Sequence, residues 1–187
     1  HQASLSDVER KKIETRIADL IAQAWHTEEI RSVRPTPVDE ARWGFSVIEN
    51  SLWEAVPDFM RELDGRLNED YDVSLPLDAS PVQFSSWMGG DRDGNPFVTS
   101  KVTEQVLLLA RKRAAKLFAL DLDRLQVELS MYDCNDELRD KVGDANEPYR
   151  ALLRPLVNKF IATRDGIADY LAGKNPDTSN WIESDDE

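Results

Sequence analysis

The chain has 187 residues, which is enough for one domain or for one part of a larger one. Charged residues make up 32% and hydrophobic residues 41%, a composition typical of a soluble globular protein, and no apolar run reaches the roughly 18 residues that a membrane span requires. The 23 basic residues are outnumbered by 36 acidic ones, and the net charge of -13 argues against nucleic acid and anionic membranes as partners. The single cysteine, Cys134, excludes an internal disulfide and fits a reducing compartment, so we expect a cytoplasmic protein. Residues 1–5 lack the features of a signal peptide, and we interpret them as a cut end.

The first part of the chain is predicted to form two helices. Ser6 and Glu9 make a capping-box pattern, and apolar residues at helical spacing then predict a helix over residues 7–26. Thr36 is the expected cap of a second helix that begins at Pro37, because proline suits the first helical turn.

The second helix carries apolar side chains around much of its surface, and we expect it to be buried on two sides. These residues are Val38, Ala41, Trp43, Phe45, Val47, Ile48, Leu52, Trp53 and Val56. Pro57 should kink or divide the helix, which then continues to about Glu69. Residues 71–81 are predicted to be a loop, and residues 82–87 either a short strand or an extended approach to the next segment.

Three more helices are predicted in the second half. Thr99 caps a long helix that should end near residue 131. A short helix over residues 137–142 is stopped by Gly143, and Pro148 opens a last helix that ends before residue 173.

These elements predict an all-α protein with at most one short strand. We assign residues 1–173 to one helical segment and residues 174–187 to an acidic linker or tail. Within that tail, Trp181 and Ile182 are expected to anchor something outside the chain.

Residues 84–99 carry the densest set of unusual residues and are the candidate functional segment. They read Phe-Ser-Ser-Trp-Met-Gly-Gly-Asp-Arg-Asp-Gly-Asn-Pro-Phe-Val-Thr. A calcium-binding loop is excluded, because Pro96 and Val102 stand where its glycine and its glutamate belong. The segment also lacks the Lys and Ser/Thr of a P-loop and the spacing of a dinucleotide fingerprint. General motifs leave a structural turn and a functional loop as open alternatives.

Residues 84–96 closely resemble a signature stretch of phosphoenolpyruvate carboxylase, and flanking segments extend the resemblance to about Gly173. Those segments are Trp25–Arg31, Arg34–Glu40, Trp43–Phe45, Glu49–Trp53, Val106–Leu109, Leu129–Met131 and Glu147–Arg150. Phe97 departs from the pattern, since we expect a polar residue there. The resemblance implies an interior fragment of a bacterial-type enzyme, which is a helical part of a larger α/β-barrel architecture.

The resemblance implies a lyase that forms oxaloacetate and phosphate from phosphoenolpyruvate and bicarbonate, fixing carbon dioxide for the tricarboxylic acid cycle. The parent would be an allosteric homotetramer that uses Mg²⁺ or Mn²⁺. Its catalytic histidine is expected before residue 1, in a Thr-Ala-His-Pro-Thr-Glu segment, and its metal carboxylates and essential lysine beyond residue 187. Neither His1 nor His26 is then catalytic, no residue here is a metal ligand, and the chain alone should be inactive.

The resemblance also implies roles within the loop. Trp87, Gly89 and Gly90 are expected to line the substrate pocket, with Trp87 as part of an apolar wall around the substrate methylene group. A second group, Asp91, Arg92, Asp93 and Asn95, is expected to support that wall. Arg92 has two candidate roles, bracing the loop through its acidic neighbours or binding an anionic substrate, and we favour the brace.

Arg31 aligns with an arginine of a sugar-phosphate activator site in plant-type members, and is either an effector residue or a solvated arginine at a helix end. A non-enzymatic acidic helical interaction module is the alternative function. The chain alone should expose apolar side chains of its second helix and can self-associate through them.

Overall fold

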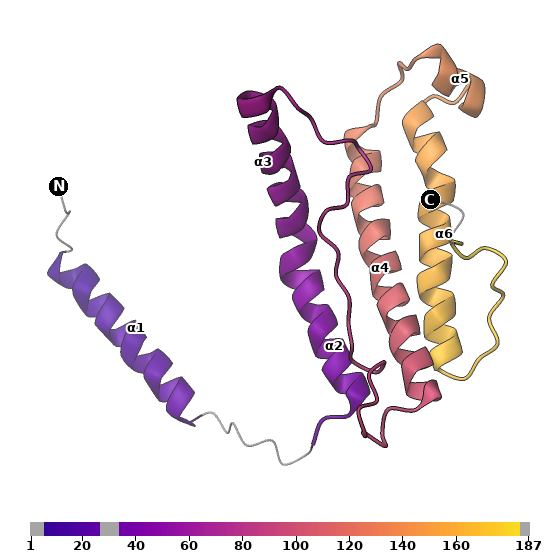
Figure 1. Cartoon of the computed structure of the whole chain (residues 1–187). Coiled ribbons are helices and arrows are strands. Elements are labelled where there is room, and N and C mark those ends of the chain that lie inside the picture. The colour runs from indigo at the N-terminus through magenta and orange to yellow at the C-terminus, as the bar shows by residue number, and fades with distance from the viewer. Residues whose placement is uncertain (1–5, 27–33, 184–187) are drawn as a thin grey trace. The chain divides into compact units, whose positions relative to one another are not determined.

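The computed structural model describes residues 6–26 and 34–183, and over these residues the fold is all helical, as predicted (Figure 1). The chain divides into two units, residues 1–34 and residues 35–187. Residues 82–87 form no strand and are extended chain, which was one of the two alternatives. No helix in the described ranges is long and apolar enough to cross a membrane.

The first unit contains helix α1 (Asp7–His26), whose bounds match the prediction. Its capping box is present: the Ser6 hydroxyl accepts the Glu9 amide at 3.3 Å, and the Ser6 amide donates to a Glu9 carboxylate oxygen at 2.9 Å. Reciprocal bonds of this kind satisfy amides that a helix start leaves unpaired. No residue of α1 is buried within the first unit.

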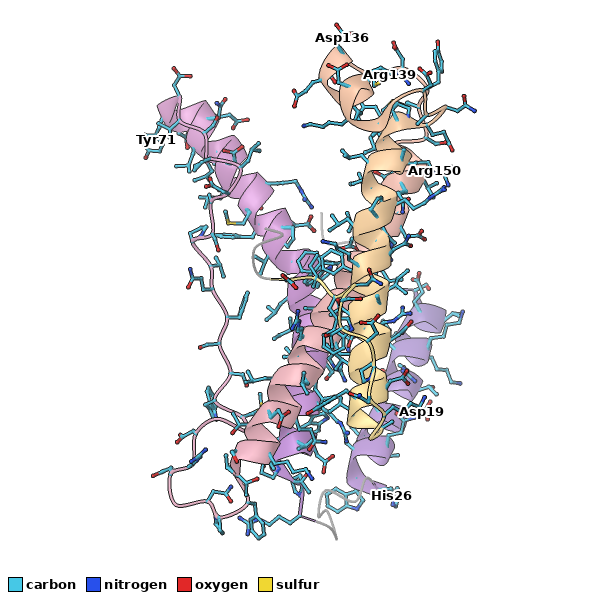
Figure 2. The ribbon with its side chains drawn as sticks, turned by 90° about the vertical axis from the view of Figure 1, so that its right-hand side faces the viewer. Asp19, His26, Tyr71, Asp136, Arg139 and Arg150 are labelled. Atoms are coloured by element: carbon cyan, nitrogen blue, oxygen red, sulfur yellow. The ribbon has the colours of Figure 1, made fainter. Side chains whose placement is uncertain are left out.

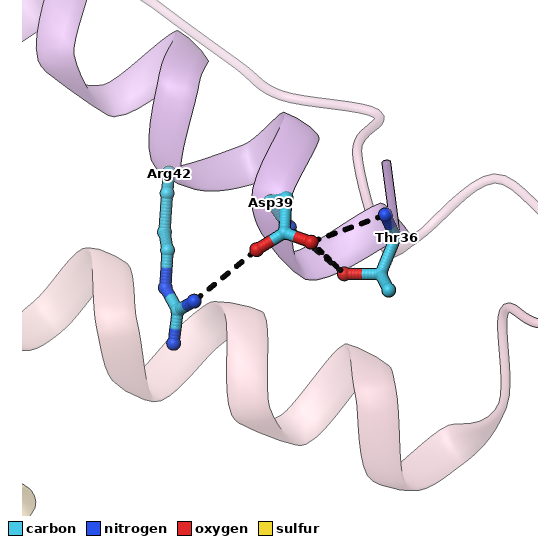
Figure 3. A network of polar contacts seen from close by, with 3 residues as sticks. All are labelled: Thr36, Asp39 and Arg42. Carbon is cyan, nitrogen blue, oxygen red and sulfur yellow. Dashed lines mark hydrogen bonds and ion pairs between the residues drawn. The ribbon is translucent and has the colours of Figure 1, made fainter. Parts of the chain in front are cut away.

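The second unit begins with α2 (Pro37–Val47), the π-helical turn η1 (Ile48–Leu52) and α3 (Trp53–Tyr71), which follow one another without a loop. The predicted start at Pro37 is confirmed. The Thr36 hydroxyl accepts the Asp39 amide at 3.2 Å, and Asp39 also pairs with Arg42 at 3.2 Å (Figure 3).

Pro57 does not divide the helix, which was one of its two predicted effects. Pro57 lies inside α3, and the departure from α-helical geometry is the turn Ile48–Leu52, which precedes it. A helical proline cannot donate a hydrogen bond and its ring crowds the carbonyl four residues earlier, here that of Trp53. The irregular turn ends directly before Trp53, with the Trp53 amide donating to the Ile48 carbonyl, so the distortion falls on the N-terminal side of the proline.

The remaining helices are α4 (Ser100–Glu128), α5 (Asp136–Val142) and α6 (Pro148–Leu171). The predicted cap at Thr99 is present, since its hydroxyl accepts the Val102 amide, and α4 ends about three residues earlier than expected. Helices α4 and α6 run antiparallel and side by side in both views, with α5 at the far end of the pair, where Figure 2 labels Asp136.

The core of the second unit has two parts. Val38, Ala41 and Phe45 of α2 pack with Val106 of α4. Helices α4 and α6 supply a second group of buried residues, which includes Ala115, Ala119, Val157, Thr163 and Ile167. The prediction that the second helix is buried on two sides is wrong for this chain, because Trp43 remains 64% exposed. The covered part of α2 packs against Val106 of α4 and, at Gly44, against Met88 of the later loop.

The segment after α6 is not free of the helices. A side chain at Gly166 of α6 would overlap the Trp181 ring, and the Arg111 guanidinium lies 5.7 Å from the centre of that ring. The Ile182 amide donates to the hydroxyl of buried Thr163 at 2.8 Å. Trp181 and Ile182 therefore contact α4 and α6 of their own chain, which corrects the expectation that they anchor something outside it.

Candidate functional site

The glycine-rich loop is seated on α4 at Gly89, which is buried and has a φ of 77°. A Cβ at this position would lie 2.7 Å from Val106 Cγ2 and 3.0 Å from Val106 Cβ, so only glycine fits. The Gly89 carbonyl accepts a 2.6 Å hydrogen bond from the Thr103 hydroxyl. The sequence thus places a glycine where the loop backbone touches the helix.

Hydrogen bonds within the loop close the turn before and after Gly89. The amides of Gly90 and Asp91 both donate to the Trp87 carbonyl at 2.9 Å. Within this turn, the Met88 side chain extends to α2, where it fills the space beside Gly44. The turn is therefore held against both α2 and α4.

Asn95 organises the second half of the loop. Its side-chain oxygen accepts the Phe97 amide at 3.0 Å, its own amide donates to the Arg92 carbonyl, and its carbonyl accepts the amide of buried Val98 at 3.2 Å. A side chain that bonds the backbone two residues on is a common device for fixing a turn.

The predicted brace between Arg92 and its acidic neighbours is not present. Among the described residues, Arg92 forms no ion pair with Asp91 or Asp93, and all three are exposed. An exposed ion pair gains too little free energy to hold two flexible side chains in one geometry. The guanidinium of Arg92 is left open to a partner.

A cavity of about 350 Å³ lies between α2, η1, α4 and residues 84–90. Gly89 and Gly90 form part of its wall, and most of the rest is apolar, including Phe45, Ile48, Val106 and Leu117. Trp87 does not line it and is 76% exposed. The structure thus brings the two glycines to the cavity, and it places Trp87 outside.

One charged cluster stands at the edge of the cavity. Glu49 of η1 pairs with Arg113 and Lys116 of α4. The hydrogen bond from Lys116 lowers the pKa of the Glu49 carboxyl, and the charges of both cations lower it further against the opposing effect of burial. One turn on, the Trp53 indole donates to Asp121 at 2.7 Å and meets Phe118 edge-on at 5.0 Å.

Sequence reasoning did not find this cluster. Glu49 and Trp53 belong to a segment that resembles the family, but their partners lie more than 60 residues later in the sequence. No local sequence pattern predicts a pair that far apart. The arrangement suits binding and positioning: an apolar hollow, a backbone wall of glycines and one neutralised carboxylate.

The other candidates bear less on the cavity. Arg31 and His1 lie outside the described residues, and His26 is exposed at the end of α1. Over residues 6–26 and 34–183, no three His, Cys, Asp or Glu side chains gather in a way that could hold a metal ion.

A family model described as phosphoenolpyruvate carboxylase matches residues 1–187. The chain belongs to the phosphoenolpyruvate carboxylase family. The glycine-rich loop, its seat on α4 and the cavity beside it are thus features of a phosphoenolpyruvate carboxylase sequence.

Curated bacterial phosphoenolpyruvate carboxylases are similar over most of this chain. That of Aeromonas hydrophila is 55% identical over 183 residues, which is 96% of this chain and 21% of the relative. That of Pseudomonas putida is 56% identical over 172 residues, covering 92% and 20%. That of Chromohalobacter salexigens is 60% identical over 164 residues, covering 88% and 19%. The chain spans about a fifth of the length of these relatives.

Proposed function

We propose that this chain is part of a longer phosphoenolpyruvate carboxylase, which forms oxaloacetate and phosphate from phosphoenolpyruvate and bicarbonate. The observation that carries the proposal is the family match over residues 1–187, together with identities of 55% and 60% to enzymes of that name. The chain alone is expected to be inactive, because it supplies neither the histidine nor the metal carboxylates that the reaction requires.

In this proposal the chain contributes binding surface. Carbon dioxide and an enolate must be kept from water, and the loop at residues 84–90 with its apolar neighbours is suited to that task. A bound Mg²⁺ or Mn²⁺ ion, held elsewhere in the parent enzyme, would supply charge neutralisation at the phosphate and the enolate oxygen. Gly89 and Gly90 would fix the backbone path beside the substrate.

We assign Trp87 to the apolar wall around the substrate methylene group. Its large exposure in this chain leaves the indole free for a surface that the rest of the parent supplies. For Arg92 the missing brace favours the other candidate role, contact with an anionic substrate. Asp91, Asp93 and Asn95 would hold the loop in place around these two.

Further features of the proposal rest on the family alone. They are an allosteric, homotetrameric parent enzyme in the cytoplasm that feeds the tricarboxylic acid cycle, and an effector-binding role for Arg31.

The test is an oxaloacetate assay on the parent enzyme carrying Trp87→Ala. Loss of the wall should raise the KM for phosphoenolpyruvate and increase the release of pyruvate in place of oxaloacetate, while the melting temperature falls little. Trp43→Ala is the matched control, since it removes another exposed tryptophan, which belongs to α2 and not to the loop. Normal kinetics in the Trp87 variant would remove it from the site.

An acidic helical interaction module remains the second candidate, because α1 presents an uncovered row of apolar side chains. A parent protein that binds another protein through this helix and forms no oxaloacetate would favour the module.

A further inference from the structure

Thr103 connects the glycine-rich loop to α4. Its hydroxyl lies 2.6 Å from the carbonyl oxygen of Gly89 and 3.2 Å from that of Thr99, one helical turn back. Within the ranges that the structure describes, this is the only side-chain hydrogen bond that joins residues 84–98 to α4. Thr103 also lines the cavity, beside Gly89 and Gly90.

The geometry fixes the position of one peptide unit. Thr103 and Val106 lie three residues apart and so share a face of α4. Val106 meets the α-carbon of Gly89 and leaves no room for a side chain, while Thr103 holds the carbonyl of the same residue. Contact on the carbon and a hydrogen bond on the oxygen together set the orientation of the Gly89–Gly90 peptide at the cavity wall.

The second acceptor makes this hold reversible. A hydroxyl has one hydrogen to donate, and the shorter distance assigns it to Gly89. If the loop lifts, the same hydrogen can turn to the Thr99 carbonyl, a bond that helical threonines commonly make to the residue four positions back. Release then leaves no unpaired donor on the helix, so opening costs less than the loss of a buried hydrogen bond normally does.

We propose that Thr103 is a positioning residue: it docks the glycine-rich loop on α4 and so sets the shape of the substrate wall. The inference rests on the proposed function for its catalytic consequence, and on the hydrogen bond alone for the docking. Thr103 acts through Gly89 and is not proposed to touch substrate.

The experiment compares Thr103→Val, which keeps the branched shape and removes the donor, with Thr103→Ser, which keeps the donor. Thr15→Val is the matched control, because the Thr15 hydroxyl makes the same kind of bond to the carbonyl four residues back, at 2.9 Å to Lys11, and belongs to α1 of the first unit. All are made in the full-length enzyme. Hydrogen exchange at the amides of Gly90 and Asp91 measures docking, and kcat and KM for phosphoenolpyruvate measure the consequence.

We expect Thr103→Val to speed exchange of these amides by about five- to tenfold, the effect of losing one hydrogen bond. The KM should rise at least several-fold, with pyruvate release increased and kcat less affected, whereas the serine and Thr15 variants should resemble wild type. A variant that fails to fold by circular dichroism is replaced by Thr103→Ala, for which the same results are expected.

Three results would overturn the proposal. They are unchanged exchange in the valine variant, faster exchange without any change in KM or product ratio, and equal damage in the serine variant, which would place the effect in packing. If the wild-type enzyme forms no oxaloacetate, the proposed function fails, while the exchange measurement still decides whether Thr103 docks the loop.

Discussion

Replacing Gly89 by alanine should destabilise the second unit more than the same change at the other loop glycines. The added methyl group would lie 2.7 Å from Val106 Cγ2 and 3.0 Å from Val106 Cβ. Because Cβ is fixed to the helix backbone, Val106 cannot rotate out of the way, and the loop must move. Overpacking of this kind costs about 1–3 kcal/mol.

The φ of 77° at Gly89 adds a second cost, about 1–2 kcal/mol for a residue with a side chain. The unfolded chain loses some freedom with alanine, which offsets up to about 1 kcal/mol. The net loss should be about 2–4 kcal/mol. Gly94 has a φ of 72° but open space around it, so Gly94→Ala isolates the backbone cost, at about 1 kcal/mol. Gly90→Ala has neither problem, since the nearest atom would be 3.6 Å away, and should be nearly neutral.

Urea unfolding of the 187-residue chain, followed by circular dichroism, measures the series. The order of destabilisation should be Gly89, then Gly94, then Gly90. Shortening Val106 to alanine should cost stability by itself but less than additively with Gly89→Ala, because it removes the overlapping atoms. If Gly89→Ala is no worse than Gly94→Ala, or the two changes at Gly89 and Val106 simply add, the loop is not seated on Val106 as described.

Three further predictions follow from other contacts. Trp181→Ala should lower the free energy of unfolding by about 2 kcal/mol, because a half-buried ring and its Arg111 contact are lost. Trp43→Ala, which removes an exposed ring, should change it little. Equal effects of the two changes in urea unfolding would show that the tail does not pack on the helices. The pKa of Glu49 is lowered, so its ion pairs stabilise the fold above the ordinary glutamate pKa and are lost as pH falls through the folded value. Glu49→Gln should therefore flatten the acid side of the plot of unfolding free energy against pH. Parallel plots for the wild type and the variant would contradict this. If the charge of Arg92 contacts an anionic substrate, Arg92→Lys in the parent enzyme should keep more than about half of the wild-type kcat/KM. A loss of kcat/KM as large as that of Arg92→Ala would instead indicate that Arg92 braces the loop.

The helix starts were predictable because their signals are local. Ser6, Thr36 and Thr99 each precede the amide that they cap by three residues, and a capping pattern of that length is visible in sequence. The importance of the loop was also visible, because several glycines and charged residues between two helices are costly without a purpose. The contact of the loop with α4 was not predictable from sequence, because a turn and the start of a helix separate Gly89 from Val106 along the chain.

The differences between the sequence interpretation and the structure have separate physical causes. Trp181 and Ile182 were expected to anchor something outside the chain, but Trp181 fits the surface of α6, where Gly166 lacks a side chain. Arg92 was expected to pair because acids flank it, but all three side chains are exposed, where an ion pair contributes little. Pro57 was recognised as a disruption, and the irregular turn lies on its N-terminal side, where its ring crowds the carbonyl one turn earlier.

Oxaloacetate formation by the full-length protein tests the central claim most directly. The purified parent is supplied with phosphoenolpyruvate, bicarbonate and Mg²⁺, and oxaloacetate is followed through reduction by malate dehydrogenase, with phosphate measured in parallel. The account predicts equal amounts of oxaloacetate and phosphate from the parent, and none from residues 1–187 alone. A parent that releases no oxaloacetate, or an isolated chain that does, would contradict it.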